Sequence, residues 1–581
     1  MFDCIIVGAG TAGCVVASRL SNDHRLNVLL IEAGADLLPG RAPASVRDYY
    51  PRSHGDPQFF WPNLVAESGA EPPGGGAAVK RPFLQARILG GGSSINGMVA
   101  LRGLPADYDE WAALGAAGWS WPEVLPYFRR LERDLDFQGP LHGSQGPIPI
   151  RRYAAPDWPP FCRATGEVFT GRGFPLIEDL NGDFRDGVGP LPMSNPPSGR
   201  VSSVDAYLDA GVRRRPNLRV ETRANVEKIL FGGGGAQAVV ARTARGRETF
   251  HARAIVICAG AIHSPALLMR SGIGAARTLR DLGIPVVAEA PGVGANLLNH
   301  PMLTLAVYLP AKSKQPYARR EWGLAALRYS SGVRDCPPSD MMMVTGNKSA
   351  WHALGRRIGS IGVMVNKPFS RGTVRLRAAD PDVAPEIKFR LLSDERDRER
   401  LTAGLAFAAS MLASDTVGRV REEVFVPDMA LVRRLGRPGP RSEFESFVLA
   451  AALNSSRRLR QRALRKRLLD VSPLARDVGA LSTLVQELTG PTGHVAGTCR
   501  MGRADDPLAV VDSKCRVHGI ERLRVIDGSV MPTLIRANTN LSIAMIAEKA
   551  SDALLDDLLG PVTGPVSSDR NETRAAGVTS P

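Results

Sequence analysis

Cysteine is sparse in this chain, and its spacing excludes the usual structural uses of this residue. Seven cysteines are scattered singly through 581 residues, and no Cys-x-x-Cys pair occurs. An odd, dispersed set argues against a disulfide framework or a zinc site and is typical of a reducing compartment. The sequence therefore predicts no bound metal and no metal-dependent catalysis.

Long hydrophobic runs are also missing. No segment approaches the roughly 18 consecutive apolar residues of a membrane-spanning helix. A strand-like apolar segment already begins at Phe2, which leaves no room for a secretory signal peptide. Hydrophobic residues make up 44% and charged residues 23% of the chain, which is ordinary for globular proteins. These features predict a cytoplasmic protein with more than one domain.

Acidic residues are too few to balance the basic ones. The formal net charge is +15, and part of the excess lies in the arginine-rich stretch Ser455–Arg467. Such a stretch indicates either a solvated helix face or contact with an anionic surface, such as a membrane, an acidic partner or nucleic acid. We favour the solvated face over membrane-surface contact. We expect no nucleic-acid partner, because no nucleic-acid-binding module is recognisable.

What the chain does contain is a nucleotide-binding pattern at its start. The strand-like segment Phe2–Val7 is followed by Gly8-x-Gly10-x-x-Gly13, a helix-like run and a second apolar strand that ends at Glu32. The first glycine permits a tight turn, the second lets a pyrophosphate approach the backbone, and the third lets the helix pack on the strand. The phosphates would bind at the helix N-terminus, and the acid would accept hydrogen bonds from a ribose. FAD and NAD share this pattern.

The remaining sequence predicts an α/β fold class with two kinds of domain. A Rossmann-like domain, discontinuous in sequence, would use a parallel sheet with helices to bind the dinucleotide, and an α+β cap with an antiparallel sheet would bind the substrate. The predicted parts are 1–300 for the dinucleotide-binding domain, with inserted lid or substrate loops at about 37–82 and 150–195; 301–484 for the substrate-binding domain; 485–560 for the return to the first domain and the active site; and 561–581 for a disordered tail.

Six motifs, in this order, resemble those of the glucose-methanol-choline (GMC) family of FAD-dependent oxidoreductases, in the branch that is similar to choline dehydrogenase. The resemblance runs from residue 2 to about 558 and is weakest between about 300 and 485. It implies that the dinucleotide is FAD. The motifs are Val7–Gly13, Arg87–Met98, Gly260–Gly274, Gly292–His300, His494–Gly502 and Val525–Pro532.

The resemblance also implies how FAD is held. Some family members link the flavin covalently to a histidine, but Ile95 takes that position here, so we expect FAD to be bound non-covalently. The implied cofactor-binding residues are Gly8, Ala9, Gly10, Thr11, Ala12, Gly13, Glu32, Ala33, Arg87, Gly90, Gly91, Ser93, Ser94, Asn96, Gly97, Met98, Val99, Val226, Ala259, Gly260, Asp527, Gly528, Asn538, Asn540 and Leu541.

The family's reaction is the oxidation of an alcohol at its CH–OH group, with hydride transfer to flavin N5. By the resemblance, His494 is the base, and the matching residue in the turn before the last helix is Asn540. We expect Asn540 to orient the substrate oxygen and to stabilise its alkoxide character. The helix beginning near Leu541 would favour negative charge on the reduced flavin. His300 is interpreted as a packing residue or one that supports the site from behind.

The substrate is expected to be a small primary alcohol, aromatic or heteroaromatic, with O2 or another electron acceptor as the oxidant. Gly493 precedes His494 where choline-type oxidases carry an aromatic residue, which argues against a quaternary ammonium substrate. A flavin-dependent lyase or decarboxylase is the alternative reaction on the same scaffold. We expect a monomer or a homodimer.

Overall fold

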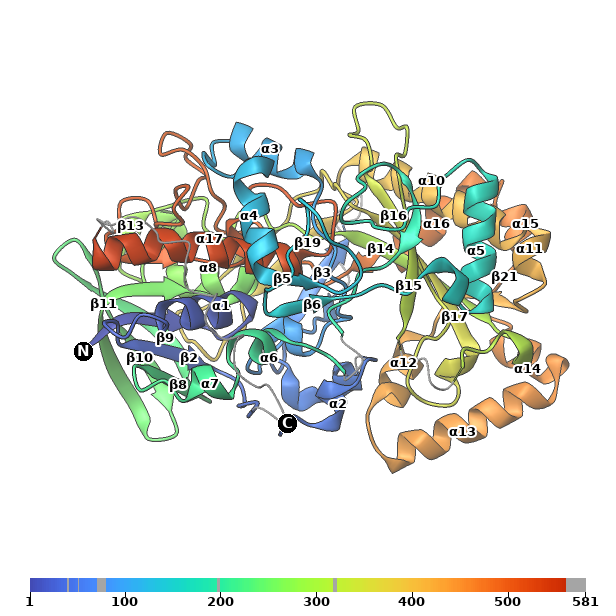
Figure 1. Ribbon diagram of the computed structural model, residues 1–581, viewed down its shortest axis with the longest axis horizontal. Coiled ribbons are helices and arrows are strands. Elements are labelled where there is room, and N and C mark those ends of the chain that lie inside the picture. The colour runs from blue at the N-terminus through green and yellow to red at the C-terminus, as the bar shows by residue number, and fades with distance from the viewer. Residues whose placement is uncertain (39–40, 51, 70–79, 196–198, 317–320, 561–581) are drawn as a thin grey trace, which may run out of the picture.

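A computed structural model describes residues 1–38, 41–50, 52–69, 80–195, 199–316 and 321–560 of the chain. Two large β-sheets lie toward opposite ends of the molecule, and the first strand and the last helix belong to the same end (Figure 1). The chain therefore returns to where it began. The predicted disordered tail, 561–581, lies outside the described residues.

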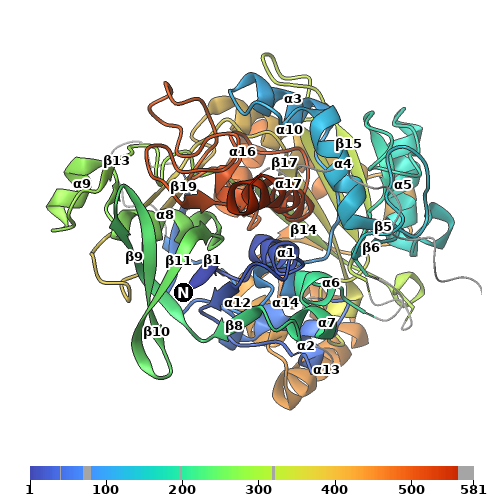
Figure 2. The same ribbon diagram turned by 60° about the vertical axis from the view of Figure 1, so that its left-hand side comes forward.

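The first sheet has a parallel core with the strand order β8-β2-β1-β11-β23. Helix α1 (Thr11–Leu20) joins β1 to β2 and packs against α17 (Thr539–Leu559), as Figure 2 shows. The predicted Rossmann-like sheet is confirmed, and its last strand comes from the end of the chain. Its strands are β1 (Phe2–Val7), β2 (Val28–Glu32), β8 (Leu218–Thr222), β11 (Gly246–Ile257) and β23 (Leu523–Val525).

Strand β11 is long enough to belong to two arrangements. Its first half pairs with β10 (Gly235–Thr243) in an antiparallel ribbon that β9 (Asn225–Gly232) completes. Its second half lies between β1 and β23 in the parallel core. This second half is a continuous apolar run, because both faces of a parallel sheet are covered.

The second sheet is antiparallel, with the order β21-β20-β14-β17-β16-β15-β7 and with β22 beside β14. One of its faces packs against α5 (Pro160–Gly171) and α10 (Glu395–Leu412). The predicted antiparallel cap sheet is confirmed. Its strands are β7 (Gly187–Pro190), β14 (Pro301–Tyr308), β15 (Gly323–Tyr329), β16 (Met341–Gly346), β17 (Ile358–Val365), β20 (Val424–Phe425), β21 (Leu468–Leu469) and β22 (Gly490–Pro491).

The segment predicted as a loop-rich insertion, 37–82, contains two strands in its described part. Strands β3 (Val65–Gly69) and β4 (Lys80–Pro82) join β19 (Glu386–Leu391) and β18 (Thr373–Arg375) in a four-stranded sheet. Both are short and rich in polar residues, so the alternating pattern that predicts a strand is absent. Residues 70–79 of this insertion lie outside the described residues.

The remaining helices and strands are α2 (Ala44–Arg47), α3 (Pro105–Ala113), α4 (Trp121–Leu131), β5 (Glu132–Asp134), β6 (Ile148–Ile150), α6 (Ser203–Tyr207), α7 (Ala210–Arg213), α8 (Gly260–Arg270), β12 (Ile273–Gly274), α9 (Ala276–Asp281), β13 (Ala288–Glu289), α11 (Asp415–Gly418), α12 (Met429–Gly436), α13 (Pro440–Ser455), α14 (Arg457–Leu464), α15 (Val471–Leu474) and α16 (Val478–Leu488). None of the helices that the structure describes is both long and apolar enough to span a membrane.

Helix α8 follows β11 directly and contains a proline. Pro265 has no N–H to donate to the carbonyl of Ala261, four residues earlier. The hydroxyl of Thr498 donates to that carbonyl instead, at 2.7 Å. The segment that carries His494 is thereby held against α8.

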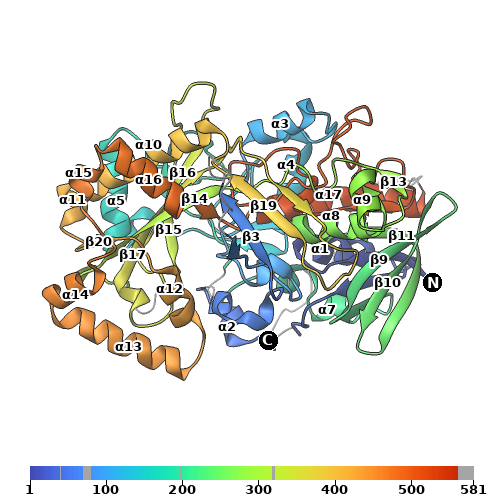
Figure 3. The ribbon, with the colours of Figure 1, turned by 180° about the vertical axis from the view of Figure 1, so that it is seen from behind.

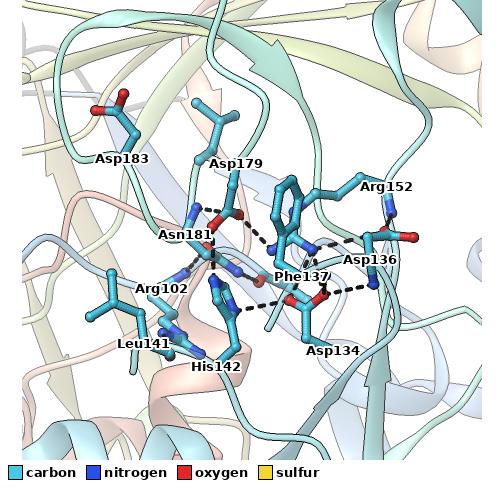
Figure 4. A network of polar contacts seen from close by, with 12 residues as sticks. Arg102, Asp134, Asp136, Phe137, Leu141, His142, Arg152, Asp179, Asn181 and Asp183 are labelled. Carbon is cyan, nitrogen blue, oxygen red and sulfur yellow. Dashed lines mark hydrogen bonds and ion pairs between the residues drawn. The ribbon is translucent and has the colours of Figure 1, made fainter. Parts of the chain in front are cut away.

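A buried ionic network joins the loops beside β5 and β6 (Figure 4). His142 Nδ1 lies 3.1 Å from Asp134 and 3.4 Å from Glu132, and its Nε2 lies 3.0 Å from Asp179. Arg152 pairs with Asp134 at 2.9 Å and with Asp179 at 2.6 Å. Burial acts to lower the pKa of His142, but its hydrogen bonds to the three carboxylates raise that pKa to about 10. His142 is therefore an imidazolium, and it acts as a counter-charge to the buried carboxylates.

Replacing His142 by glutamine should destabilise the fold by about 3–5 kcal/mol, because it removes one cation from a buried group of carboxylates. The raised pKa of His142 means that its stabilisation is fully present below about pH 6.5 and is lost as the pH rises through about 10. Urea unfolding at pH 7 and above pH 10 measures both effects. The exposed His24→Gln variant is the control, and equal unfolding midpoints for the two variants at pH 7 would contradict the prediction.

Candidate active site

A cavity of about 1150 Å³ lies between the two sheets. Pockets for drug-sized ligands usually enclose about 300–1,000 Å³. This cavity is therefore large enough for a dinucleotide together with a small substrate. Its lining combines the turn after β1, the segment that follows Arg87, one face of the antiparallel sheet, and the segments around His494 and Asn538.

The glycine-rich turn after β1 is shaped by close backbone contacts. Gly8 has a φ of +99°, and a Cβ there would lie 2.5 Å from the carbonyl oxygen of Cys258. A Cβ on Gly13 would lie 1.9 Å from the carbonyl oxygen of Gly8. At Gly10, by contrast, the Cβ position has no atom within 4 Å, and no side chain caps α1. The N-terminus of α1 therefore faces open space, as the binding of a diphosphate requires.

Glu32 closes the same turn from the end of β2. Its Oε2 accepts a hydrogen bond from the Ala9 N–H at 2.9 Å, and its Oε1 accepts one from the Gly34 N–H at 2.7 Å. Burial raises the pKa of the Glu32 carboxyl, and the two backbone N–H groups act in the opposite direction. Each carboxylate oxygen has a further lone pair, so the side chain can still accept from a ribose hydroxyl.

The second glycine-rich segment folds against the first. A Cβ on Gly91 would lie 2.8 Å from the Cα of Gly10. The side-chain oxygen of Asn96 accepts from the Met98 N–H and from the Arg200 guanidinium, each at 3.0 Å. The backbone of this segment therefore forms the cavity wall next to the N-terminus of α1.

Six of the predicted cofactor-binding residues do not line the cavity. The hydroxyls of Ser93 and Ser94 turn inward and donate to the carbonyls of Gly90 at 2.6 Å and Leu89 at 2.8 Å. Leu541 is buried in the core. The six residues are Ala9, Gly13, Gly90, Ser93, Ser94 and Leu541. The predicted residues that do line the cavity are Gly8, Gly10, Thr11, Ala12, Glu32, Ala33, Arg87, Gly91, Asn96, Gly97, Met98, Val99, Val226, Ala259, Gly260, Asp527, Gly528, Asn538 and Asn540.

His494, the predicted base, lies in a chain of three hydrogen bonds that fixes its tautomer. His300 Nε2 is 3.0 Å from the carbonyl oxygen of Ile535, which can only accept, so this nitrogen carries the proton of the neutral ring. His300 Nδ1 must then accept from His494 Nδ1, at 2.8 Å. The neutral His494 ring is therefore protonated at Nδ1, which leaves the lone pair of its Nε2 to accept from Asn538, 3.0 Å away.

Burial keeps both imidazoles neutral. It lowers the pKa of His494 to about 4 and that of His300 well below its ordinary value. Sequence reasoning interpreted His300 as a packing or supporting residue. The structure places it in direct contact with His494, where it orients the ring.

The structure pairs His494 with Asn538, whereas the sequence predicted Asn540 as its partner. The side-chain oxygen of Asn540 accepts from the Thr11 hydroxyl at 2.7 Å, which ties the start of α17 to the start of α1. Helix α17 begins at Thr539, two residues before the expected start. Asn538 is therefore the residue that precedes the first turn of α17. Asn540 lies within that turn, and its side chain is directed to Thr11 rather than to His494.

Two helix N-termini face the cavity without a capping side chain. One is α1, preceded by Gly10, and the other is α17, whose flanking residue Asn538 turns its amide to His494 instead. Helix α8 differs, because Asp527 accepts from the Gly260 N–H at 2.8 Å. Uncapped N–H groups favour negative charge, which suits a diphosphate at α1 and an electron-rich ring at α17.

One face of the antiparallel sheet forms another wall of the cavity. Side chains alternate along a strand, so Leu303 and Val363 pack behind the sheet while their neighbours face the cavity. Sequence reasoning missed this wall, because both faces of these strands are buried and the alternation is weak. The residues of this wall are Met302, Thr304, Val344, Ser360, Gly362 and Met364, with Trp322 directly before β15, and none of them is charged.

Two family models match most of the chain. The N-terminal and C-terminal models of GMC oxidoreductases match residues 2–302 and 368–547. The chain therefore belongs to the GMC oxidoreductase family, and it is an FAD-dependent enzyme that acts on CH–OH groups. The predicted family and cofactor are confirmed.

Known relatives agree along almost the whole chain. The 5-(hydroxymethyl)furfural oxidase of Methylovorus sp. (strain MP688) is 40% identical over 568 residues, covering 96% of this chain and 99% of the relative. Oxygen-dependent choline dehydrogenase 1 of Chromohalobacter salexigens is 31% identical over 601 residues, covering 95% and 94%. The crystal structure of pyridoxine 4-oxidase from Mesorbium loti matches with a TM-score of 0.78 at 26% identity, covering 95% of this chain and 99% of that one.

The residues of the cavity fit FAD. The open position beside Gly10, the uncapped α1 terminus and the Glu32 carboxylate suit the diphosphate and the ribose. The buried Nε2 of His263, another lining residue, has no hydrogen-bond partner among the described residues. A polar ligand in this cavity would supply hydrogen-bond partners for the uncapped N–H groups of α1 and for His263 Nε2.

Two glycine variants should separate cofactor binding from folding. Gly10→Ala should leave the apoprotein folded, because its Cβ meets no protein atom, and should weaken FAD binding by about tenfold or more, since the methyl group enters the diphosphate space. Gly13→Ala should destabilise the apoprotein by about 1–3 kcal/mol, because its Cβ meets the Gly8 carbonyl. Thermal unfolding and FAD titration of each apoprotein measure the two effects. Parent-like FAD affinity in Gly10→Ala would contradict the prediction.

Proposed function

We propose that this enzyme oxidises neutral primary alcohols, aromatic or heteroaromatic, to aldehydes, with His494 as the base. The observation that carries the proposal is the orientation of His494. Its Nδ1–H is held by His300, so that the lone pair of Nε2 points to the Asn538 amide at the cavity, and a substrate hydroxyl would take the place of that amide as its partner. FAD, when bound, supplies the hydride acceptor, flavin N5.

In this proposal the two side chains divide the work on the substrate hydroxyl. His494 Nε2 accepts the hydroxyl proton, while Asn538 Nδ2 donates to the substrate oxygen as negative charge develops there. The proton on Nδ1 stays shared with His300, whose own N–H is anchored on the Ile535 carbonyl. The ring therefore cannot rotate away from the substrate without breaking two hydrogen bonds.

The uncharged sheet wall supports a neutral substrate. Met302, Val344 and Trp322 offer apolar surface against which an aromatic ring packs well. A quaternary ammonium is usually held by an aromatic cage, and Gly493 brings no side chain to the position before His494. The relative named as a 5-(hydroxymethyl)furfural oxidase supports the same substrate class.

Anaerobic mixing of the purified holoenzyme with candidate alcohols tests the proposal. We expect 5-(hydroxymethyl)furfural or benzyl alcohol to bleach the visible absorbance of the flavin, and choline to do so far more slowly. Faster bleaching by choline would overturn the substrate class. Product formed without bleaching would identify a lyase or decarboxylase instead, a reaction that the relatives described above do not support.

A further inference from the structure

Helix α13 carries an apolar stripe on its outward face. Phe444 is 70%, Phe447 63% and Val448 46% exposed, and their spacing places them on one side of the helix. The residues that α13 buries are Ser446 and Ala450. Leu449 and Leu453 also pack inward against a small apolar cluster. The helix is therefore apolar on its inner side and again on its exposed side, unlike an ordinary surface helix with one apolar face.

Basic residues are concentrated in the helices next to α13 in the chain. The segment Met429–Arg467, which we call the α12–α14 face, contains eleven lysines and arginines and two acidic residues, so that its net charge of +9 is more than half of the +15 of the whole chain. Six of these cations have no ion-pair partner within the described part of the chain: Arg433, Arg437, Arg458, Arg462, Arg465 and Lys466. Charge alone favours a solvated helix face over contact with a membrane surface. The exposed phenylalanines of α13 favour membrane contact instead.

The α12–α14 face also adjoins the cavity. Met429, Val432 and Arg433 of α12 contribute to the cavity lining. Met429 is 56% and Val432 45% exposed, so the apolar rim of the cavity is continuous with the outer surface. In Figures 1 and 3 helix α13 lies at an outer edge of the molecule, with α12 beside it.

We propose that the α12–α14 face docks on an anionic membrane surface. Phe444 and Phe447 would enter the boundary between headgroups and acyl chains, and the surrounding arginines would pair with lipid phosphates. A second copy of the chain is a poor occupant, because two-fold pairing would bring one +9 surface against another. This inference goes beyond the proposed function, since it gives apolar alcohols a direct route from the bilayer to the cavity rim.

Vesicle co-sedimentation of the holoenzyme tests the proposal. We expect it to bind vesicles that contain phosphatidylglycerol at least about tenfold more tightly than vesicles of phosphatidylcholine alone, and to lose this binding at high salt. Arg462→Gln with Arg465→Gln should weaken binding about 25-fold, at about fivefold for each basic residue. Phe444→Ser with Phe447→Ser should weaken it about tenfold or more.

Matched pairs of substitutions elsewhere are the controls. Arg277→Gln with Arg280→Gln removes the same charge from α9, which lies toward the opposite end of the molecule from α13 (Figure 3). Leu114→Ser with Leu176→Ser removes two side chains that are 46% and 51% exposed. Both pairs should change binding less than about twofold. Thermal unfolding shows that each variant is folded.

Three outcomes would overturn the proposal. The parent does not bind anionic vesicles, the control pairs weaken binding as much as the test pairs do, or light scattering shows a dimer that the Phe444→Ser and Phe447→Ser pair dissociates. The last result would make the face an interface between copies. Because vesicle binding is measured without substrate, a failure here is distinct from a failure of the proposed reaction, which flavin bleaching reports.

Discussion

Replacing His494 by alanine should slow flavin reduction by about 10²–10⁴-fold, the usual contribution of a positioned base. The variant loses the Nε2 lone pair that His300 holds toward the cavity, and no other imidazole takes its place in that chain of hydrogen bonds. Anaerobic stopped-flow mixing with a saturating alcohol measures the rate constant. FAD content should stay at the parent level, because His494 is held by protein side chains and is separate from the nucleotide turn.

His518→Ala is the matched control for this experiment. The His518 ring lies 3.2 Å from the carbonyl oxygen of Gly502 and is not part of the cavity lining. The flavin of the His518→Ala enzyme should be reduced by the alcohol at the same rate as in the parent. A His494→Ala enzyme that reduces its flavin within about tenfold of the parent would remove His494 from the role of base.

Replacing Asn538 by alanine should lower the rate of flavin reduction by about 10²–10³-fold, as the loss of one preorganised donor to a developing oxyanion does elsewhere. Asn538 is the amide in contact with His494 Nε2, and it lines the cavity. Asn540→Ala provides the contrast. It should change the rate much less and should reduce stability by about 1 kcal/mol, because it removes the hydrogen bond to Thr11 that ties α17 to α1.

The two asparagine variants are compared under the same conditions. Flavin reduction, FAD content and the thermal unfolding midpoint are measured for each. If Asn540→Ala loses more of the rate constant than Asn538→Ala while retaining FAD, the partner predicted from sequence is the functional one, and the contact between Asn538 and His494 is incidental.

The nucleotide-binding half could be predicted because its signals are local. Gly8, Gly10, Gly13 and Glu32 lie within one βαβ unit, where the spacing of the residues nearly dictates their geometry. The residue that contacts His494 from the turn before α17 was harder to predict from the sequence. Asn538 and Asn540 both favour helix starts, and only the tertiary contact with His494 separates them.

Other parts of the site depend on contacts between distant segments. His300 and His494 are 194 residues apart, and the tautomer argument needs the Ile535 carbonyl as well. Strands β14 and β17 are largely buried on both faces, and only Thr304 and Ser360 break their apolar sequence, so the alternation that would mark the side chains reaching the cavity is weak. Sequence reasoning could therefore find the base, but it could not find the residue that orients it or the wall that faces the substrate.

The late arrival of β23 and α17 has a consequence for biosynthesis. About 270 residues separate the end of β11 from β23, so at roughly 5–20 residues per second the ribosome needs on the order of 13–50 seconds to supply the partner strand. During that interval the nascent chain exposes an unpaired edge of β11 and the face of α1 that α17 later covers. An open apolar edge invites pairing with other chains. The cavity residues Asp527 and Asn538 arrive with β23 and α17, so the complete cavity forms only after these elements have been synthesised. A polypeptide truncated before β23 should be captured by chaperones or aggregate.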